Sequence, residues 1–554
     1  QVCYCVLCSV VCCEKIDPTT MKGSLLPLFL ATAVVVVASV MSVCAASVES
    51  PITMNGEAAW PQEAVTAALQ DTPGFQVASI RGYKLLDTFE RSQLYEVEAD
   101  GYADPVKLVV LRGSRLQMGT AYGKMLAKSV RGVYTTFVEN LIPKESERAL
   151  LELFVDWQWD TYLSQQTPQE FKDEIQGIKE GGEMALTSFL DRYVSRVITL
   201  ANSPGDADDF IEILWGEFQD WLRNITSTSM TQSLPVGSLD KEFQSIRKAM
   251  SAMQCSMFGV WGSRTKNGNL FTGRNLDWTK DTGIYKFKLV TVYHPDGKIP
   301  HATVGFEGFV GALTGMSKAG LTVHEANLEE SVETFLGFPW VLRLRYIMEN
   351  ANNLAEARTL WEHTNNTVGF NHMVGSSSDA PKGPAALVME TEAGYTAYFY
   401  DNDPREAEAM YTDAQGQTKH LGAPLKEAVF RTNHGYDPTI RKTYMWGVKT
   451  HAFQDSVQRY FLLSQTIADQ GTTGSFDWLQ AVNTTSVLGQ KGPNYLTCPN
   501  DNSGINVLSV AFHPASSQMW AAWEDGTGPS WRAACCNTYI NFDMTYWLSD
   551  ENLL

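Results

Sequence analysis

The chain has 554 residues, of which 44% are hydrophobic and 19% are charged. This composition excludes a disordered chain, a coiled coil and a collagen-like fibre. The 62 acidic and 43 basic residues give a net charge of −19, and no run of Lys and Arg forms a local basic patch. Because an acidic surface repels phosphate backbones, we do not expect nucleic acid as a partner.

The N-terminal region has the pattern of a secretory signal. Met21 and Lys22 precede an uncharged stretch in which residues 25–40 are apolar and residues 42–46 are small. This order is typical of a signal peptide, and we predict cleavage near Ala46. An uncleaved signal anchor is the alternative, because the apolar run approaches the length that spans a bilayer. Residues 1–46 are therefore interpreted as an upstream segment and a signal peptide.

Two further features suit a chain that enters the secretory route. Glycosylation sequons begin at Asn224, Asn365 and Asn483, although such triplets also occur by chance in long chains. No second apolar run approaches membrane length, so we expect no stable membrane span once the signal is removed. The predicted location is secreted, or the lumen of a lysosome or endosome.

Residues 47–254 are predicted to form a mostly helical N-terminal chain. Apolar residues recur at spacings of three and four over residues 119–141, 147–163, 171–200 and 208–222. Pro204-Gly205 and Pro235 mark breaks between these segments. This part of the chain corresponds to a propeptide or an alpha subunit.

From Cys255 onward the apolar period shifts towards two, which is typical of strands. Strands are expected over residues 287–293, 301–306, 386–390 and 395–400, and the Lys266–Asn269 segment has the composition of a hairpin turn. Helices are expected over residues 339–351, 355–362 and 456–469. Residues 255–554 therefore form a second, strand-rich part of the chain, and the whole protein is of the α+β class.

Several kinds of site are not supported by the sequence. It contains no G-x-S-x-G elbow, Walker loop, G-x-G-x-x-G segment or H-E-x-x-H motif. The nine histidines lack the spacing of metal ligands. We therefore expect neither a metal nor a cofactor.

One cysteine has companions that could make it reactive. Cys255 opens the strand-rich half, and Arg274 and Asp277 lie on the returning strand of the predicted hairpin. A cation beside a thiol favours the thiolate, and a carboxylate can hold an ammonium group. Spacing alone would favour a buried structural cysteine instead.

The amino-acid sequence of this hairpin favours a reactive cysteine over a structural one. Cys255-Ser256-x-Phe258-x-x-Trp261-Gly262 followed by Gly273-Arg274-Asn275-Leu276-Asp277-Trp278 resembles the start of the catalytic chain in cysteine N-terminal-nucleophile (Ntn) hydrolases. The most similar group is the autoproteolytic acyltransferase/hydrolase family typified by isopenicillin N acyltransferase. Bile salt hydrolases, penicillin V acylases and acid ceramidase are more distant. The resemblance covers roughly residues 107–525.

The resemblance implies a fold and a reaction. The fold is a four-layer αββα sandwich with a helical N-terminal segment. The chain would cut itself between Gln254 and Cys255, and the two resulting chains would remain associated. Cys255 would then attack a linear N-acyl amide substrate through its thiol, with its own α-amino group as the base. Arg274 would favour the thiolate and contact the substrate, and Asp277 would orient the ammonium.

Three further positions match segments of that family. Gly315–Val323 resembles a hairpin that leads to Asn327. Thr432-Asn433-His434 resembles an element whose asparagine, Asn433, would donate to the oxyanion, with Asn327 as the candidate second donor. The segment from Asp455 to Phe461 resembles one that carries a late active-site arginine, here Arg459, with Arg441 as a competing candidate. The expected catalytic residues are Cys255, Arg274, Asp277, Asn327, Asn433 and Arg459.

Other functions stay open at this point. They are an acyltransferase of the same family, a phospholipase B-like lipid hydrolase, and a secreted glycoprotein without catalysis. A papain-like protease with His434 as the base lacks the cysteine signature of that class. In an oxidising compartment Cys498 could pair with Cys535 or Cys536, whereas a bond between the adjacent Cys535 and Cys536 would be strained.

Overall fold

The computed structural model describes residues 75–142, 144–202, 217–218, 220–221, 254–278, 282–471, 474–489 and 505–549. The predicted signal region, the sequon at Asn224 and Cys498 lie outside these ranges. All described residues belong to one compact unit within residues 59–554.

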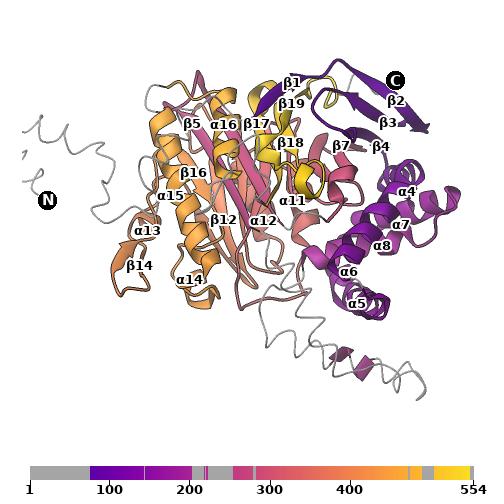
Figure 1. The fold of residues 1–554 in the computed structure, drawn as a ribbon, viewed down its shortest axis with the longest axis horizontal. Helices are drawn as coiled ribbons and strands as arrows, with labels where there is room; N and C mark the ends of the chain where they lie inside the picture. The colour runs from indigo at the N-terminus through magenta and orange to yellow at the C-terminus, as the bar shows by residue number, and fades with distance from the viewer. Residues whose placement is uncertain are drawn as a thin grey trace, which may run out of the picture. The chain divides into compact units, whose positions relative to one another are not determined.

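Two large sheets form the centre of this unit (Figure 1). The seven-stranded sheet has the order β1 (Gln76–Ser79), β19 (Thr538–Asp543), β18 (Gln518–Trp523), β17 (Asn506–His513), β6 (Gly268–Asp277), β5 (Gln254–Gly262) and β16 (Ala428–Arg431). The ten-stranded sheet has the order β13 (Tyr395–Phe399), β12 (Ala386–Glu392), β11 (Phe370–Ser376), β10 (Leu321–Asn327), β9 (Thr314–Ser317), β8 (His301–Phe306), β7 (Lys288–Pro295), β4 (Lys107–Gly113), β3 (Ser92–Glu98) and β2 (Gly82–Phe89).

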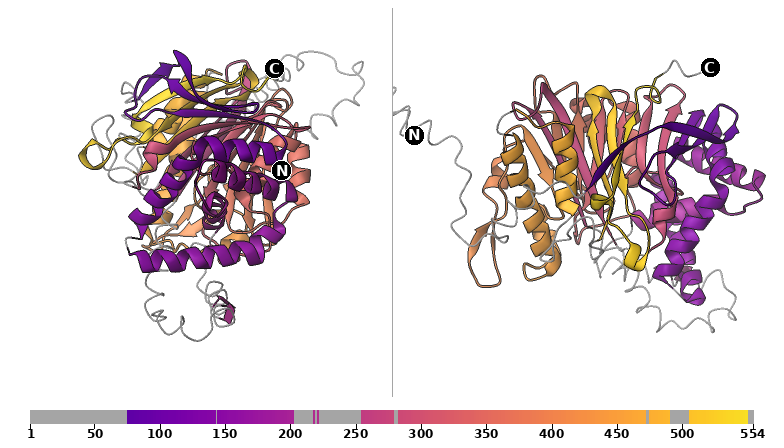
Figure 2. Two further views of the ribbon diagram at one scale, coloured as in Figure 1. Left: turned by 90° about the vertical axis from the view of Figure 1, so that its right-hand side faces the viewer. Right: turned by 45° about the horizontal axis from the view of Figure 1, so that its top comes forward.

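Helices cover the outer faces of both sheets. The sheets pack on each other through β10 against β5 and β6, and through β12 against β16. Helices α15 (His451–Gly471) and α16 (Trp478–Gly489) lie against β5, β6 and β17 (Figure 2). Helices α11 (Trp340–Asn350) and α12 (Leu354–Glu362) lie against β9, β10 and β11. The predicted four-layer αββα architecture is therefore confirmed.

Burial on both faces explains why the central strands read as apolar runs. Every residue of β7, β8 and β10 is buried, because each sheet is covered by the other sheet and by helices. Smaller elements complete the described part: β14 (Met410–Thr412) pairs with β15 (Thr418–His420), and short helices occupy Ile284–Phe287, Pro404–Ala407 (α13), Ile440–Thr443 (α14), Pro514–Ser516, Gly528–Ser530 and Ala534–Cys536.

The N-terminal part is helical as predicted, but it also contributes strands. Its helices are α4 (Arg115–Leu141), α5 (Glu145–Gln158), a π-helical turn (Trp159–Leu163), α6 (Ser164–Gln166), α7 (Gln169–Met184) and α8 (Leu190–Ala201). The single helix expected over 171–200 is interrupted where Leu186 and Phe189 adopt φ of 57° and 64°. Such left-handed residues end a helix. Most of the helix expected over 208–222 lies outside the described residues.

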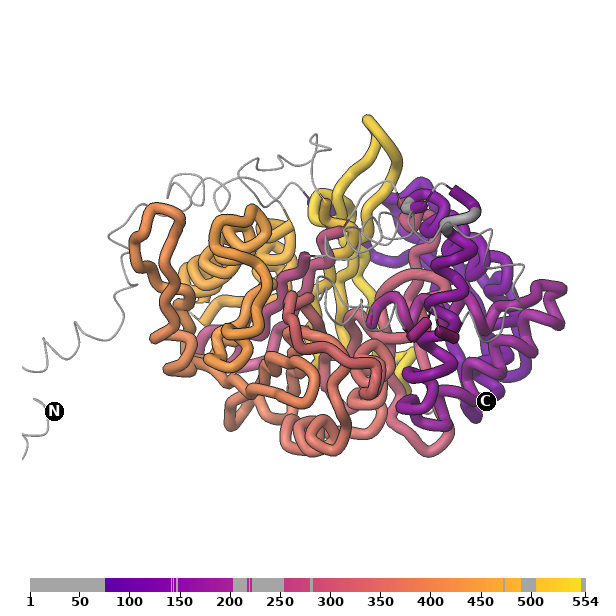
Figure 3. The backbone as a smooth tube through the Cα atoms, turned by 90° about the horizontal axis from the view of Figure 1, so that it is seen from below, coloured from indigo at the N-terminus to yellow at the C-terminus, as the bar shows by residue number. Residues whose placement is uncertain are grey.

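Glycines let α4 and α7 pack very closely. These two helices lie together at one end of the ten-stranded sheet (Figure 3). A Cβ atom at Gly119 would lie 2.0 Å from the carbonyl oxygen of Glu174, and one at Gly177 would lie 2.3 Å from that of Leu116. Only glycine fits such a contact between helix backbones.

Strands from before Cys255 enter both sheets. β1 pairs in parallel with β19 at the edge of the seven-stranded sheet. β4 lies between β3 and β7, and its pairing with β7 is parallel. These four N-terminal strands were not predicted from the sequence. The parts before and after residue 255 are thus hydrogen-bonded to each other in two separate sheets.

Two observations concern the cysteines and the membrane. The Sγ atoms of Cys535 and Cys536 lie 3.7 Å apart, too far for a disulfide bond between neighbours. Cys498 lies outside the described residues, so a disulfide bond between Cys498 and Cys536 stays a prediction. Within the described ranges, no helix combines the length and the apolar character needed to cross a bilayer.

Candidate active site

The β5–β6 hairpin brings the three predicted residues of the cysteine motif together. Asn267 and Gly268 both have positive φ, as the expected tight turn requires. In the resulting register, Gln254 pairs with Asp277 and Cys255 pairs with Leu276. The turn sequence therefore fixes which residues of the returning strand lie beside Cys255.

The thiol of Cys255 is enclosed between two charged groups. Its side chain is buried, with Arg274 Nη2 3.3 Å and Glu325 Oε2 3.9 Å from Sγ. Arg274 also forms an ion pair with Glu325 and donates from Nε to the Glu325 backbone oxygen at 3.3 Å. Arg274 therefore bridges the nucleophile and a buried carboxylate.

Glu325 is a site residue that the sequence analysis missed. It lies on β10 two positions before Asn327, and it is buried together with Arg274. A glutamate in the middle of the strand Leu321–Asn327 was the available signal, because a carboxylate that becomes buried needs a partner. Its contact with Sγ exists only because β10 packs face to face on β5.

The surroundings keep this thiol protonated in the uncut chain. Burial and the negative charge of Glu325 raise the pKa of Cys255 to about 12, and Asp277 acts in the same direction. Arg274 and the backbone N–H of Asn327 oppose this rise in pKa. Because a thiol is a weak nucleophile, attack by Cys255 requires a group that accepts its proton.

Asp277 and Asn506 form the next contact outward. Asp277 Oδ1 accepts a hydrogen bond of 2.9 Å from Asn506 Nδ2 on β17. Asp277 is fully buried, and its register partner is Gln254, the residue before the nucleophile. The charge of Asp277 also raises the pKa of Cys255, so this buried carboxylate lies close to the thiol.

The Asn433 side chain contacts the backbone of Cys255 and the backbone of Asn327 at the end of β10. Its Oδ1 accepts from the Cys255 backbone N–H at 2.9 Å, and its Nδ2 donates to the Asn327 backbone oxygen at 2.7 Å. The Asn327 side chain instead donates to Glu329. Asn327 thus reaches Cys255 through its backbone N–H, whereas the sequence analysis expected its side chain to act with Asn433.

The structure separates the two competing arginines. Arg459 on α15 is fully buried; it contacts Cys255 O at 2.5 Å from Nη1 and Asn433 Oδ1 at 2.8 Å from Nη2. Asp455, one helical turn earlier, holds its Nε at 2.8 Å. Arg441 is exposed and donates to the Met410 backbone oxygen. Arg459 therefore lies in the site and Arg441 does not.

His434 does not face the thiol. Its Nδ1 contacts Ser456 Oγ and its Nε2 contacts Tyr436 Oη, each at 2.8 Å. Burial and the charges of nearby arginines hold the pKa of His434 well below its usual value. Both ring nitrogens are used in this way, so a papain-like pairing with Cys255 is not formed.

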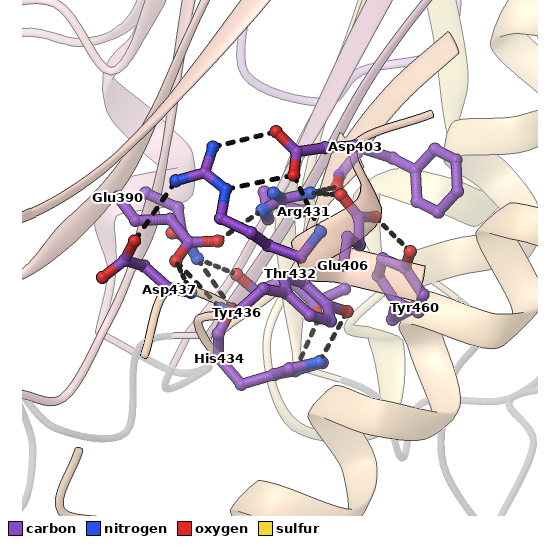
Figure 4. A network of polar contacts seen from close by, with 12 residues as sticks. Glu390, Asp403, Glu406, Arg431, Thr432, His434, Tyr436, Asp437 and Tyr460 are labelled. Atoms are coloured by element: carbon purple, nitrogen blue, oxygen red, sulfur yellow. Dashed lines mark hydrogen bonds and ion pairs between the residues drawn. The ribbon is translucent and has the colours of Figure 1, made fainter. Parts of the chain in front are cut away.

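A buried ionic network fixes the loop that carries Asn433 (Figure 4). Arg431 donates to Glu390 Oε1 at 3.0 Å and to Glu406 Oε2 at 2.9 Å. The other oxygen of Glu390 accepts the backbone N–H groups of Tyr436 and Asp437, at 2.8 and 2.9 Å. The network therefore clamps both ends of the segment around Asn433.

Replacing Asn433 by alanine is expected to lower kcat by about 10² to 10³-fold, as loss of one oxyanion donor typically does. Steady-state kinetics of the purified variant would measure this. Asn350→Ala, at the end of α11, is the matched control and should retain wild-type kcat. An unchanged kcat in Asn433→Ala would remove Asn433 from the catalytic group.

Acidic side chains gather beside the same loop. The Thr443 hydroxyl faces Glu330 Oε2 and, at 2.6 Å, Glu392 Oε2. One hydroxyl hydrogen cannot serve two carboxylates, so one of the two must carry a proton. Burial raises the pKa of Glu330 to about 9, with Glu392, Glu390 and Glu333 adding to the rise. The next residue, Tyr444, donates to the Asn433 backbone oxygen at 2.6 Å.

This arrangement predicts a fold that is more stable in acid. The folded chain keeps a proton on Glu330 that the unfolded chain releases near pH 4.5, so stability falls as the pH rises from there to about 9. Each pH unit in this window changes the free energy of unfolding by up to about 1.4 kcal/mol. The free energy of unfolding, measured with urea between pH 5 and 8, should depend less steeply on pH in Glu330→Gln than in wild type. Glu356→Gln, on the surface, should keep the wild-type slope; equal slopes in all three would contradict the assignment.

No cluster of three or more His, Cys, Asp or Glu side chains that could hold a metal ion occurs among the residues with described positions. The groups around Cys255 are instead suited to holding a thiol, a carbonyl oxygen and an amine. They are two guanidinium groups, two carboxylates and one carboxamide.

A family model matches part of this chain. Residues 263–460 match the acyl-coenzyme A:6-aminopenicillanic acid acyl-transferase family. This range is about a third of the chain; it includes Arg274, Asp277, Asn433 and Arg459 and begins after Cys255. The resemblance to Ntn hydrolases is thereby confirmed, and the match supports hydrolysis of an amide or acyl transfer.

Other comparisons give more distant relatives. An uncharacterized protein of Archaeoglobus fulgidus is 22% identical over 462 residues, which cover 82% of this chain and 69% of that protein. An N-acylethanolamine-hydrolyzing acid amidase ortholog of Caenorhabditis elegans is 17% identical, with a TM-score of 0.33 over 47% of this chain and 93% of the other. Penicillin V acylase from Agrobacterium tumefaciens is 16% identical, with a TM-score of 0.34 over 54% and 89%. At such TM-scores, the fold assignment depends on the strand order and layers of this chain.

Proposed function

We propose that this chain is a secreted or lysosomal amidohydrolase that cuts itself before Cys255 and then hydrolyses a linear N-acyl amide. The observation that carries the proposal is the meeting of Cys255, Arg274, Glu325, Asn433 and Arg459 in one buried cluster. These residues come from β5, β6, β10, the loop after β16 and α15. A structural cysteine would need none of these charged neighbours.

The self-cut follows an N-to-S shift. Cys255 Sγ forms a bond to the carbonyl carbon of Gln254, the C–N bond breaks, and the thiol proton ends on the released α-amino nitrogen. Glu325, 3.9 Å from Sγ, is within reach to carry this proton. Water then hydrolyses the thioester, which leaves a carboxylate on Gln254 and restores the thiol.

Turnover repeats this chemistry on an external amide. The α-amino group of Cys255 has an ordinary pKa of roughly 7.7–8.0, so it accepts the thiol proton near neutral pH. Sγ forms a bond to the substrate carbonyl carbon, and the amine leaves with a proton from that ammonium. Asp277 orients the ammonium, and Asn433 donates to the oxyanion once a substrate displaces its contact with Asn327. Water finally releases the acid.

Arg274 has a further capacity in this reaction. Its Nη1 is buried and makes no hydrogen bond among the described residues. This donor is available for the substrate carbonyl or a nearby polar group. Arg274 would thus stabilise the thiolate through Nη2 and hold the substrate through Nη1.

Intact-mass analysis and N-terminal sequencing of the purified protein test the self-cut. We expect one chain that starts at Cys255 and a second chain that elutes with it in gel filtration, because strands from both parts share two sheets. A single uncut chain with full activity would overturn the proposal. Separation of the two chains under native conditions would contradict the expectation that they remain associated after the cut.

Substrate assays separate the remaining functions. N-acyl amides of different chain length should be hydrolysed, whereas phospholipid esters should not. An added amine that captures the acyl group would indicate an acyltransferase, which is the favoured alternative because the family model describes one. A titratable thiol without any turnover would indicate a glycoprotein without catalysis.

The proposed location predicts a glycan on Asn365. This side chain is exposed, whereas Asn483 is half-buried on α16. Protein from a secreting eukaryotic host should therefore lose mass on glycosidase treatment, and Asn365→Gln should reduce that loss. An identical mass loss in Asn365→Gln would show that Asn365 is not modified.

A further inference from the structure

One guanidinium group holds three consecutive residues around the bond to be cut. Arg459 Nη1 donates to Cys255 O at 2.5 Å and to Ser256 Oγ at 2.9 Å. Its Nη2 donates to Gln254 Oε1 at 3.3 Å. Arg459 therefore contacts both sides of the Gln254–Cys255 peptide bond.

The N–H of that peptide bond is held by the same assembly. Asn433 Oδ1 accepts from the Cys255 N–H at 2.9 Å and from Arg459 Nη2 at 2.8 Å. Asp455 fixes Arg459 at 2.8 Å from the previous turn of α15, with both side chains buried. The positions of the Gln254 carboxamide and of the Cys255 N–H are thus coupled through one buried arginine.

The geometry points to Gln254 as a positioning residue for the self-cut: its side-chain carboxamide lets Arg459 orient the carbonyl that Cys255 attacks. This inference rests on the proposed function. The carboxamide forms and breaks no covalent bond; it restricts rotation of the residue before Cys255. Fixing the attacked group in a productive orientation raises the rate of an intramolecular attack.

The charge of the surroundings explains why an amide suits this position. Gln254 lies opposite Asp277 in the hairpin, and Glu325 is close to the same thiol. A carboxylate at position 254 would add a third negative charge to this cluster, whereas an alanine or glycine would offer Arg459 no acceptor. Glutamine supplies an acceptor oxygen without a charge.

Cutting kinetics of freshly synthesised full-length chain would test this. Wild type, Gln254→Leu, Arg459→Lys and the double variant are made by cell-free synthesis, and the uncut fraction is followed over time on denaturing gels. Leucine keeps a side chain of similar bulk but removes the acceptor oxygen. Gln254→Leu should cut about 10-fold more slowly, as expected for loss of a hydrogen bond to a charged group. Gln254→Asn, whose side chain is one methylene shorter, should cut at a rate between those of wild type and Gln254→Leu.

The double variant separates positioning from a general structural effect. If Gln254 acts through Arg459, Gln254→Leu should slow the Arg459→Lys chain by less than about two-fold, because the coupled partner is already altered. A Gln254→Leu chain that cuts at the wild-type rate, or effects that simply multiply in the double variant, would overturn the inference alone. A wild-type chain that is never cut at Cys255 would overturn the proposed function, and this inference with it.

Discussion

Replacing Cys255 by alanine is expected to abolish both the self-cut and amide turnover. Alanine removes the only atom placed to attack, and loss of a nucleophile lowers kcat by about 10⁴-fold or more. The variant should appear as one chain on a denaturing gel and show no hydrolysis of N-acyl amides. Cys255→Ser should cut slowly, because a hydroxyl can make the same attack less readily.

Cys535→Ala is the matched control, since this second buried cysteine lies on a different element. It should cut and turn over like wild type. A Cys255→Ala chain that retains activity would mean that another residue performs the attack. A Cys255→Ala chain that is still cut at this position would mean that the cut depends on a different protein.

Replacing Arg431 by methionine is expected to lower the free energy of unfolding by about 3–5 kcal/mol. The variant leaves Glu390 and Glu406 buried without their cation, and their burial already raises the pKa of each. Because Glu390 also holds the backbone after Asn433, turnover should fall together with stability (Figure 4). Urea unfolding would measure the loss.

Arg405→Met is the matched control for Arg431→Met. Arg405 contacts Asp403 and Asp437 in the same network, but 37% of its side chain is exposed to solvent. Exposed ion pairs contribute little, so the loss should stay below about 1 kcal/mol. Changing Glu390 and Glu406 to glutamine together with Arg431→Met should recover part of the stability, because no unpaired charge then remains buried. Equal losses for the two arginine variants would contradict this account.

Local chemistry explains what could be predicted. The turn residues Asn267 and Gly268 specify the hairpin, and the hairpin register places Arg274 and Asp277 near Cys255. At the start of α4 the Ser114 side chain accepts a hydrogen bond from the Gln117 backbone N–H, and the Gln117 side chain accepts one from the Ser114 backbone N–H. Each of these features depends on residues that are close in sequence, so the sequence pattern contains the information.

Other features of the fold and of the site were not predicted from the sequence. β1 and β4 were not recognised, because their pairing partners β19 and β7 lie far along the chain. The pairing of β2 with β3 and of β3 with β4 is local, and these strands were missed in spite of it. Glu325 was missed, and Asn327 contacts Cys255 with its backbone while its side chain contacts Glu329, because both positions depend on how β10 packs against β5. Contacts between layers are set by sheet packing, which no local spacing encodes.

By itself the sequence determined the class of fold, and it predicted Cys255 as the nucleophile with two charged companions on its hairpin. Only the tertiary structure decided which arginine serves the site. Arg441 and Arg459 are equally plausible as residues of a late segment, but α15 covers β5, so one face of that helix points at Cys255 and carries Arg459 there. These groups are buried between the layers of the fold. Because charges that are removed from water interact strongly, the two arginines and the carboxylates act on one another and on the thiol.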